Sequence, residues 1–163
     1  MKMDIIWAPW RMGYILKKKK KGCIFCSMKK GKDDEKNFVV GRGKFSFVVL
    51  NIFPYNNGHL MIAPYRHIKN IENLKEDEER EILKLLRISI KILKKILKPE
   101  GFNIGINIGK VSGAGVEGHL HIHIVPRWEG DTNFMPVISE TKVIPQSLKE
   151  LYKILREEFE KCI

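Results

Sequence analysis

The spacing of apolar residues along the chain predicts two amphipathic helices and several short strands. Over residues 76–98 apolar side chains recur every three or four positions with lysines and arginines between them, which predicts one long helix. Acidic residues fill its first turn and lysines its last, as the helix dipole favours, and Pro99 ends it. A similar pattern over residues 147–161 predicts a C-terminal helix. Short apolar or alternating runs predict strands at residues 38–40, 45–50, 59–63, 102–108 and 119–125.

Short connections between successive strands indicate an antiparallel sheet, because parallel neighbours need a long crossover between them. We therefore expect an α+β fold with an antiparallel sheet of about five strands, a long central helix and a C-terminal helix. The 163 residues show no internal repeat and no linker, so we expect a single domain over residues 1–163. Residues 1–21 combine several large aromatic side chains with the run Lys17–Lys21, which indicates a docking segment followed by a lysine-rich loop.

Composition narrows the class of protein. Hydrophobic residues make up 44% of the chain, as in globular proteins, and no apolar run approaches the roughly 20 residues of a membrane span. The stretch Met1–Asp4 begins no signal-peptide hydrophobic region, so we expect a cytoplasmic location and no membrane partner. Three cysteines are too few for a disulfide framework. The net charge of +11 would attract polyanions, whether nucleic acid, acidic lipid or polyphosphate nucleotides.

Three histidines at alternate positions are the most informative feature of the chain. His119, His121 and His123 alternate with apolar residues, and only two further histidines occur, His59 and His67. Because a strand places alternate side chains on one face, we expect the three imidazoles to point to the same side, about 6–7 Å apart. Imidazole can act as a nucleophile, as a proton donor or acceptor, and as a metal ligand, so the arrangement predicts chemistry at this strand.

The segment Cys23-Ile-Phe-Cys26 admits two interpretations. A thioredoxin-like redox pair belongs at the start of a helix in a parallel-sheet context, whereas this pair follows a lysine run and precedes a charged stretch. We favour half of a tetrahedral zinc site, for which His67 and the three alternating histidines supply candidate ligands. Those three histidines could alternatively hold one metal, but the cysteines would then have no role. A division in which one histidine joins the cysteines and another stays free to react uses every residue.

These motifs resemble the histidine triad (HIT) family of nucleotide-binding enzymes. The stretch from His119 to Val125 is similar to the family signature. Further similarity lies in Asn51-x-x-Pro54, Gly58–Pro64 and Asn107–Gly109. The flanks resemble the branch of the family that contains microbial diadenosine tetraphosphate phosphorylases, and they are Trp7–Arg11, Gly22–Cys26 and residues 126–134. The resemblance implies a HIT-like fold for the predicted sheet and helices.

The resemblance implies a role for each motif residue. His121 would be the nucleophile that attacks the α-phosphorus of a nucleotide and forms a covalent nucleotidyl-imidazole. His123 would form a hydrogen bond with a phosphate oxygen, and His59 would lie in the same catalytic cluster. Asn51 would bind the ribose hydroxyls, and Asn107 would contact phosphate.

The resemblance also implies a structural zinc ion, whose ligands would be Cys23, Cys26, His67 and His119.

Many relatives carry a Gly-Gln-Ser/Thr stretch before the triad, where this chain has Gly115-Val116-Glu117-Gly118. We expect Ser112 or backbone amides to make the phosphate contacts of the missing amide and hydroxyl.

We therefore expect an enzyme that cleaves a phosphoanhydride of a purine nucleotide, preferably a diadenosine polyphosphate, with phosphate or water as the acceptor. The family resemblance also implies a homodimer, and we do not expect nucleic acid as a partner of the enzyme. Two alternatives stay open. One is a phosphoramidase or adenosine phosphosulfate-splitting enzyme that uses the same nucleophile. The other is a zinc-stabilised protein that binds nucleotides or RNA without catalysis, which the charge of +11 and the lysine run favour.

Overall fold

The computed structural model describes residues 22–29, 33–131, 144 and 146–163. The docking segment and lysine-rich loop expected over residues 1–21 lie outside these residues, as does the end of the 126–134 motif beyond Asp131. No helix in the described part of the chain is long and apolar enough to cross a membrane. The division of the chain into one domain stays a prediction.

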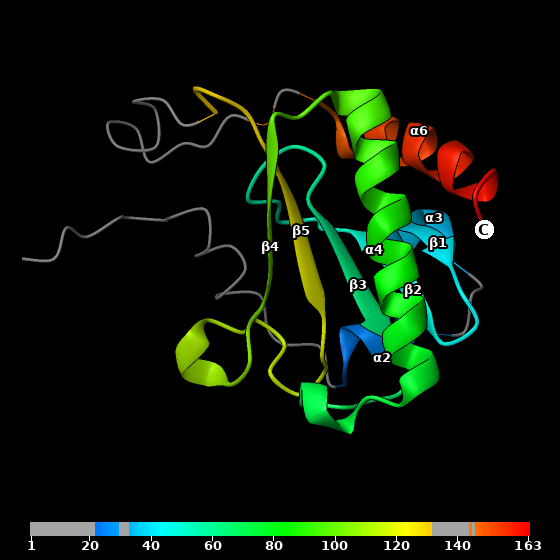
Figure 1. Cartoon of the computed structure of the whole chain (residues 1–163), viewed down its shortest axis with the longest axis vertical. Helices are drawn as coiled ribbons and strands as arrows, with labels where there is room; N and C mark the ends of the chain where they lie inside the picture. Colours follow the sequence, from blue (N-terminus) through cyan, green and yellow to red (C-terminus); the bar gives the residue numbers. More distant parts are fainter. Residues whose placement is uncertain (1–21, 30–32, 132–143, 145) are drawn as a thin grey trace, which may run out of the picture.

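Five strands form one antiparallel sheet in the order β1–β2–β3–β5–β4 (Figure 1). They are β1 (Val39–Arg42), β2 (Ser46–Leu50), β3 (Leu60–Pro64), β4 (Gly101–Ile106) and β5 (Ile122–Arg127). With the long helix and the C-terminal helix described next, this sheet confirms the α+β fold predicted from the sequence.

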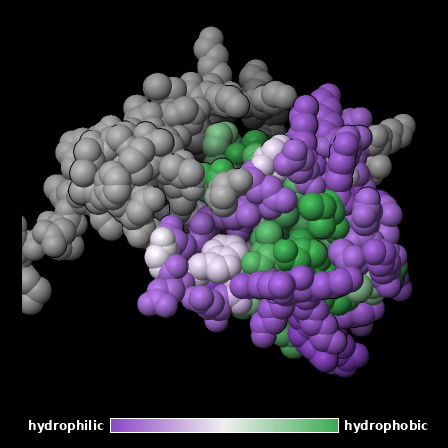
Figure 2. All heavy atoms as spheres, turned by 90° about the horizontal axis from the view of Figure 1, so that it is seen from above, coloured by the Kyte–Doolittle hydropathy of each residue, from purple (hydrophilic) through white to green (hydrophobic). Residues whose placement is uncertain are grey.

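Two long helices cover one face of the sheet. α4 (Glu76–Leu97) packs on β2 and β3, and α6 (Leu148–Glu160) packs beside α4 and against β1 (Figure 1). Their apolar faces and the strands enclose the main core, in which Leu60, Leu93 and Leu155 are fully buried. Burial of each such leucine contributes about 2 kcal/mol, which explains why the apolar stripe of each helix turns inward. Seen from above, apolar residues gather in the centre of the described surface within a border of polar residues (Figure 2).

A smaller core lies on the opposite face of the sheet. The short helix α2 (Ile24–Met28) places Phe25 there, against strand residues that include Met61. Strand alternation explains the division, because Leu60 and Ile62 of β3 point toward α4 whereas Met61 points toward α2. Three further short elements complete the described chain: α3 (Asp34–Asn37), η1 (Ile71–Asn73) and η2 (Lys110–Ser112).

The strand that carries the triad begins later than predicted. β5 starts at Ile122, so of the three alternating histidines only His123 lies on a regular strand. The reason is a local hydrogen bond, in which the Leu120 N–H donates to the carbonyl of Ile68 at 2.7 Å. The backbone N–H of Leu120 is therefore bonded to the loop after β3, where a regular strand would continue the ladder with β3.

β5 also runs past its predicted end, through Pro126 to Arg127. β3 pairs with β5 only as far as Ile124, so beyond that point β5 has β4 as its one neighbour in the described sheet. On the side of β5 that has no strand partner, no N–H donor is required. Pro126, which has no N–H, therefore does not end the strand.

Other strand ends moved by one or two residues. Phe38, predicted to start a strand, has a left-handed φ of 57° and ends α3, so β1 begins at Val39 and extends to Arg42. β3 covers Leu60–Pro64 where residues 59–63 were predicted, and β4 ends at Ile106. The two long helices agree with the prediction to within one or two residues.

Candidate functional site

A histidine cluster, here defined as His59, His121 and His123, lies on the face of the sheet turned away from α4. His123 pairs with Met61 in the β3–β5 ladder, on the face of the smaller core. His59 lies just before β3 and is fully buried, with its ring centroid 5.1 Å from that of His123. The rings of His121 and His123 are 4.8 Å apart. The preceding Gly58 has a φ of +74°, and a Cβ there would lie 2.5 Å from a leucine methyl group of α4, so the turn that delivers His59 requires glycine.

Hydrogen bonds fix the tautomers of His59 and His123. The backbone N–H of Tyr55 donates to His59 Nδ1 at 3.1 Å, and Asn51 Nδ2 lies 3.3 Å from the same atom. A neutral His59 ring therefore carries its proton on Nε2, which donates to His123 Nδ1 at 2.9 Å. The proton of His123 is then on Nε2, a buried atom that has no hydrogen-bond partner among the described residues. A buried donor of this kind is available to an anionic ligand.

His121 presents a bare ring nitrogen. Its Nδ1–H donates to the backbone carbonyl of His119 at 2.8 Å, so in the neutral ring Nε2 keeps its lone pair. The side chain is 5% exposed, and burial lowers its pKa against a smaller opposing effect of this hydrogen bond. Burial also lowers the pKa of His123 to about 4, with a further contribution from His121. A neutral imidazole with a fixed lone pair can act as a nucleophile without first losing a proton.

A second group of side chains converges beside this cluster. We call it the Cys–His group, and it consists of Cys23, Cys26, His67 and His119. His119 Nδ1 lies 3.2 Å from Cys23 Sγ and 3.6 Å from Cys26 Sγ. His67 Nδ1 lies 3.2 Å from Cys26 Sγ, and all four ligand atoms are within 4.8 Å of one another. Ligand atoms around a tetrahedral zinc ion lie roughly 3.3–3.8 Å apart, so this donor set fits such an ion.

The tautomer of His119 also suits a metal ligand. Its Nε2–H donates to the backbone carbonyl of Pro64 at 2.9 Å, which leaves Nδ1 unprotonated and facing the two sulfur atoms. The cysteines do begin a helix, α2, but the sheet is antiparallel and both sulfur atoms face histidines. The group can therefore hold a metal ion, and the context of a thioredoxin-like pair is absent from the described fold.

Two aromatic side chains that no motif singles out border the site. Phe25 is 1% exposed, and its ring centroid lies 5.2 Å from that of His119 and 4.9 Å from that of His121. Tyr55 stacks its ring 5.9 Å from that of His123. The one sequence signal for Phe25 is its place between the two cysteines, where an apolar residue opens a helix that must dock on the sheet.

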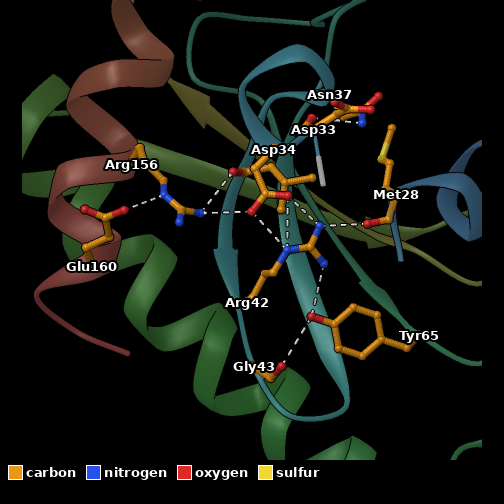
Figure 3. Close-up of polar contacts among 10 residues, drawn as sticks. Met28, Asp33, Asp34, Asn37, Arg42, Gly43, Tyr65, Arg156 and Glu160 are labelled. Atoms are coloured by element: carbon orange, nitrogen blue, oxygen red, sulfur yellow. Dashed lines mark hydrogen bonds and ion pairs between the residues drawn. The ribbon is translucent and has the colours of Figure 1, made fainter. Parts of the chain in front are cut away.

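Arg42 ties the cysteine-bearing helix to the rest of the fold (Figure 3). Its Nη2 donates to the carbonyl of Met28, at the end of α2, at 2.7 Å and to Asp34 Oδ1 at 2.6 Å. Its Nη1 lies 3.3 Å from the hydroxyl of Tyr65, and Arg156 of α6 approaches the same aspartate at 3.4 Å. The hydrogen bond with Asp34 raises the pKa of Arg42, so the pair stays charged. One side chain therefore connects α2, α3 and β1 and, through Asp34, α6.

The predicted nucleotide-binding residues lie at three places. Asn51 follows β2 and contacts His59, so it adjoins the histidine cluster. Asn107 directly follows β4, next to the start of β5. Ser112 lies in η2, where its exposed hydroxyl donates to two carbonyls of its own loop at 2.8 and 2.9 Å. Within the described chain no hydrogen bond joins Ser112 to the cluster, and its contact with a ligand stays a prediction.

Similarity to known proteins identifies the family. Residues 32–130 match the HIT domain family. Over 162 residues the chain is 38% identical to an AP-4-A phosphorylase of Mycobacterium tuberculosis. The aligned region covers 94% of this chain and 83% of that protein. An adenosine 5'-monophosphoramidase of Schizosaccharomyces pombe is 30% identical over 105 residues, or 64% of this chain and 74% of that one.

Solved structures share the fold. A hypothetical histidine triad nucleotide-binding protein from Sulfolobus tokodaii matches with a TM-score of 0.68 at 29% identity, over 85% of this chain and 93% of that one. A zinc-bound histidine triad family protein from Mycobacterium smegmatis has the same TM-score, 0.68, at 23% identity, over 86% of this chain and 94% of that one, and this likeness concerns the fold alone. The chain is therefore an enzyme of the histidine triad family.

Proposed function

We propose that this enzyme cleaves a diadenosine polyphosphate through a covalent nucleotidyl-histidine. The observation that carries the proposal is the bare Nε2 of His121, whose other ring nitrogen donates to the His119 carbonyl at 2.8 Å. A lone pair held in one direction suits attack on phosphorus. The relative that is 38% identical and named AP-4-A phosphorylase supports this substrate class.

In the proposed reaction His121 Nε2 attacks the α-phosphorus of diadenosine tetraphosphate. A nitrogen–phosphorus bond forms while the bond from that phosphorus to the bridging oxygen breaks, and ATP leaves with the electron pair. Inorganic phosphate then attacks the nucleotidyl-imidazole, the nitrogen–phosphorus bond breaks, and ADP is released. With water as the acceptor the product is AMP. A covalent intermediate of this kind divides one difficult displacement into two easier ones.

His123 and His59 would act on the charge of the phosphates. The buried Nε2–H of His123 would donate to a phosphate oxygen as negative charge develops there. His59 would hold that proton on the correct nitrogen, because it donates to His123 Nδ1 at 2.9 Å. Asn51 would reach the ribose hydroxyls from its place beside His59, and we keep the phosphate roles proposed for Asn107, Ser112 and the backbone amides.

A second activity at the same site is supported by the Schizosaccharomyces pombe relative, an adenosine 5'-monophosphoramidase that is 30% identical over 105 residues. A phosphoramidate, or adenosine phosphosulfate, would present the same α-phosphorus to His121 and differ only in the leaving group. A substrate panel distinguishes these activities from the cleavage of a diadenosine polyphosphate.

We also propose that the Cys–His group binds a structural zinc ion. Two sulfur and two nitrogen donors match the softness and the tetrahedral preference of zinc, and protein atoms would fill all four positions. The ion would fasten α2 to the segment before β5 and would not contact substrate. We keep the prediction of a cytoplasmic location, where thiols stay reduced and available to metal.

We propose a homodimer formed along β4. This strand is at the edge of the sheet, its middle residues are exposed, and Ile104 is 45% exposed. An open edge strand with apolar side chains is a ready surface for pairing with a second copy.

Replacement of the nucleophile tests the main proposal. We expect His121→Ala to lower the turnover of diadenosine tetraphosphate by at least about a thousandfold, since no other group would form the covalent intermediate. Ile154→Ala, at a half-exposed position of α6, should retain full activity. The assay follows ATP, ADP and AMP with and without phosphate, and adenosine phosphoramidate and adenosine phosphosulfate are tested beside the dinucleotide. Full activity of His121→Ala would remove the mechanism, and the absence of turnover in wild type would remove the substrate.

The lowered pKa of His123 predicts a pH dependence of stability. Between its ordinary value and about 4 the native state binds fewer protons than the unfolded state, so stability is complete above about pH 6.5 and falls as the pH approaches 4. The shift corresponds to roughly 3 kcal/mol. Urea unfolding of wild type and His123→Gln at each pH measures this contribution. The free energy of unfolding of the variant should not show this part of the decrease as the pH falls. Parallel pH curves for the two proteins would contradict the shift.

Metal content tests the zinc proposal. Elemental analysis should find about one zinc ion per chain. Cys23→Ser should lose the zinc and, with it, a large part of the free energy of unfolding. The binding of structural zinc contributes on the order of 10 kcal/mol to that free energy. Cys162→Ser is the matched control, because that exposed thiol lies outside the Cys–His group and its loss should change neither property. A metal-free wild-type protein of unchanged stability would refute the proposal.

Light scattering tests the dimer. Wild type should have twice the mass of one chain at micromolar concentration, and Ile104→Lys should give single chains, because a charge would interrupt pairing along β4. Lys153→Gln, at an exposed position of α6, should remain dimeric. A wild-type mass equal to one chain would exclude this assembly.

A further inference from the structure

The solvent face of α4 carries a continuous row of cations. We call it the α4 ridge, and it consists of Lys84, Arg87, Lys91 and Lys94, all of them exposed. The residues follow one another at steps of three and four within α4, so they stand on one side of the helix. From first to last the ridge extends about 15 Å along the helix axis.

Nothing in the described chain neutralises this row. None of the four side chains has an ion pair or a hydrogen bond with another described residue, and after Glu81 the helix contains no acidic residue at all. Like charges three or four positions apart repel one another and destabilise a helix. The ridge therefore opposes folding, and a favourable contact with a polyanion would offset that repulsion.

The other long helix shows that the fold does not require such a row. α6 alternates both signs, and several of its charged residues form ion pairs, such as Arg156 with Glu160 and Glu158 with Lys161 just past its end. That mixture is the usual surface of a charged, solvent-exposed helix. The single sign of the α4 ridge is thus a property of this surface and not of the composition alone.

The position of the ridge separates it from the nucleotide site. α4 packs on one face of the sheet (Figure 1), the face formed by Leu60 and Ile62. His123 pairs with Met61 and points to the opposite face. Charges on the far side of a folded domain, beyond the screening length of about 8 Å, have little effect on a ligand at the histidine cluster. A partner on the ridge would leave that cluster accessible.

The chemistry of the ridge selects among polyanions. A helix that binds a membrane surface inserts an apolar face into it, but the apolar face of α4 is already buried in the main core and only Leu83 is strongly exposed among its hydrophobic residues. Protein interfaces use aromatic or apolar anchors at their centre, and the four ridge residues offer none. A phosphate backbone requires only regularly spaced cations.

We propose that the α4 ridge binds the phosphate backbone of a nucleic acid duplex, without reading its sequence. One strand of a duplex presents about four phosphates over the 15 Å or so that the ridge spans, which matches its four cations. This partner differs from the expectation drawn from the sequence for the enzyme, which did not include nucleic acid, although the non-catalytic alternative allowed binding to RNA.

Salt-dependent binding tests the proposal with two triple variants of equal charge. The first, Lys84→Gln with Arg87→Gln and Lys91→Gln, removes three cations from the ridge. The control is Lys69→Gln with Lys149→Gln and Lys153→Gln, which removes three exposed cations elsewhere. Fluorescence anisotropy with a labelled DNA duplex of about 20 base pairs, from about 50 to 300 mM salt, gives the affinity and its salt slope. Circular dichroism checks that both variants keep their helices.

For wild type we expect a slope of log affinity against log salt of about −4, as four phosphate contacts require. The ridge variant should lose at least about tenfold in affinity, with a slope less negative by two to three, whereas the control should stay close to wild type. Equal losses in both variants would assign the binding to net charge and overturn the proposal. The proposal would also be overturned by a wild-type protein that binds no duplex, or that binds phosphatidylserine vesicles and not the duplex.

Discussion

Backbone carbonyl groups decide which nitrogen each buried imidazole presents, and the chemistry of the site depends on that choice. The carbonyl of Pro64 accepts the Nε2 proton of His119, so Nδ1 faces the cysteines. The carbonyl of His119 accepts the Nδ1 proton of His121, so Nε2 is left bare. Losing either buried hydrogen bond would cost about 1–3 kcal/mol, which holds each ring in one tautomer. Identical side chains two residues apart thereby become a candidate metal ligand and a candidate nucleophile.

The alternation of β3 and β5 keeps the reactive face apart from the main core. Ile122 and Ile124 of β5 point into the core beneath α4, and His123 between them points to the other side. A shift of one residue in the β3–β5 register would exchange the two sets. The same apolar residues that stabilise the sheet therefore orient the imidazole, and α4 is left with a solvent face that the chemistry does not use.

Elements with a long periodic pattern were predictable from the sequence. α4 and α6 were predicted to within one or two residues, because an amphipathic helix repeats its pattern over several turns. The end of a strand depends on partners far along the chain, and the bond from Leu120 to Ile68 that delays β5 has no local signal. Arg42 stands between two glycines and reads as part of a turn, yet it joins α2 to three other elements. The four residues of the Cys–His group, which the family resemblance implied as ligands, do converge.

Phe25 belongs to two sites at once. Its ring lies 5.2 Å from that of His119, in the Cys–His group, and 4.9 Å from that of His121. A smaller side chain would open space beside both histidines, and a larger one would displace both. Packing against both histidine rings therefore restricts which residue can occupy this position. The adjacent Ile24 is 43% exposed and is not restricted in this way. Among sequences that share this chemistry, position 25 should be inherited almost unchanged.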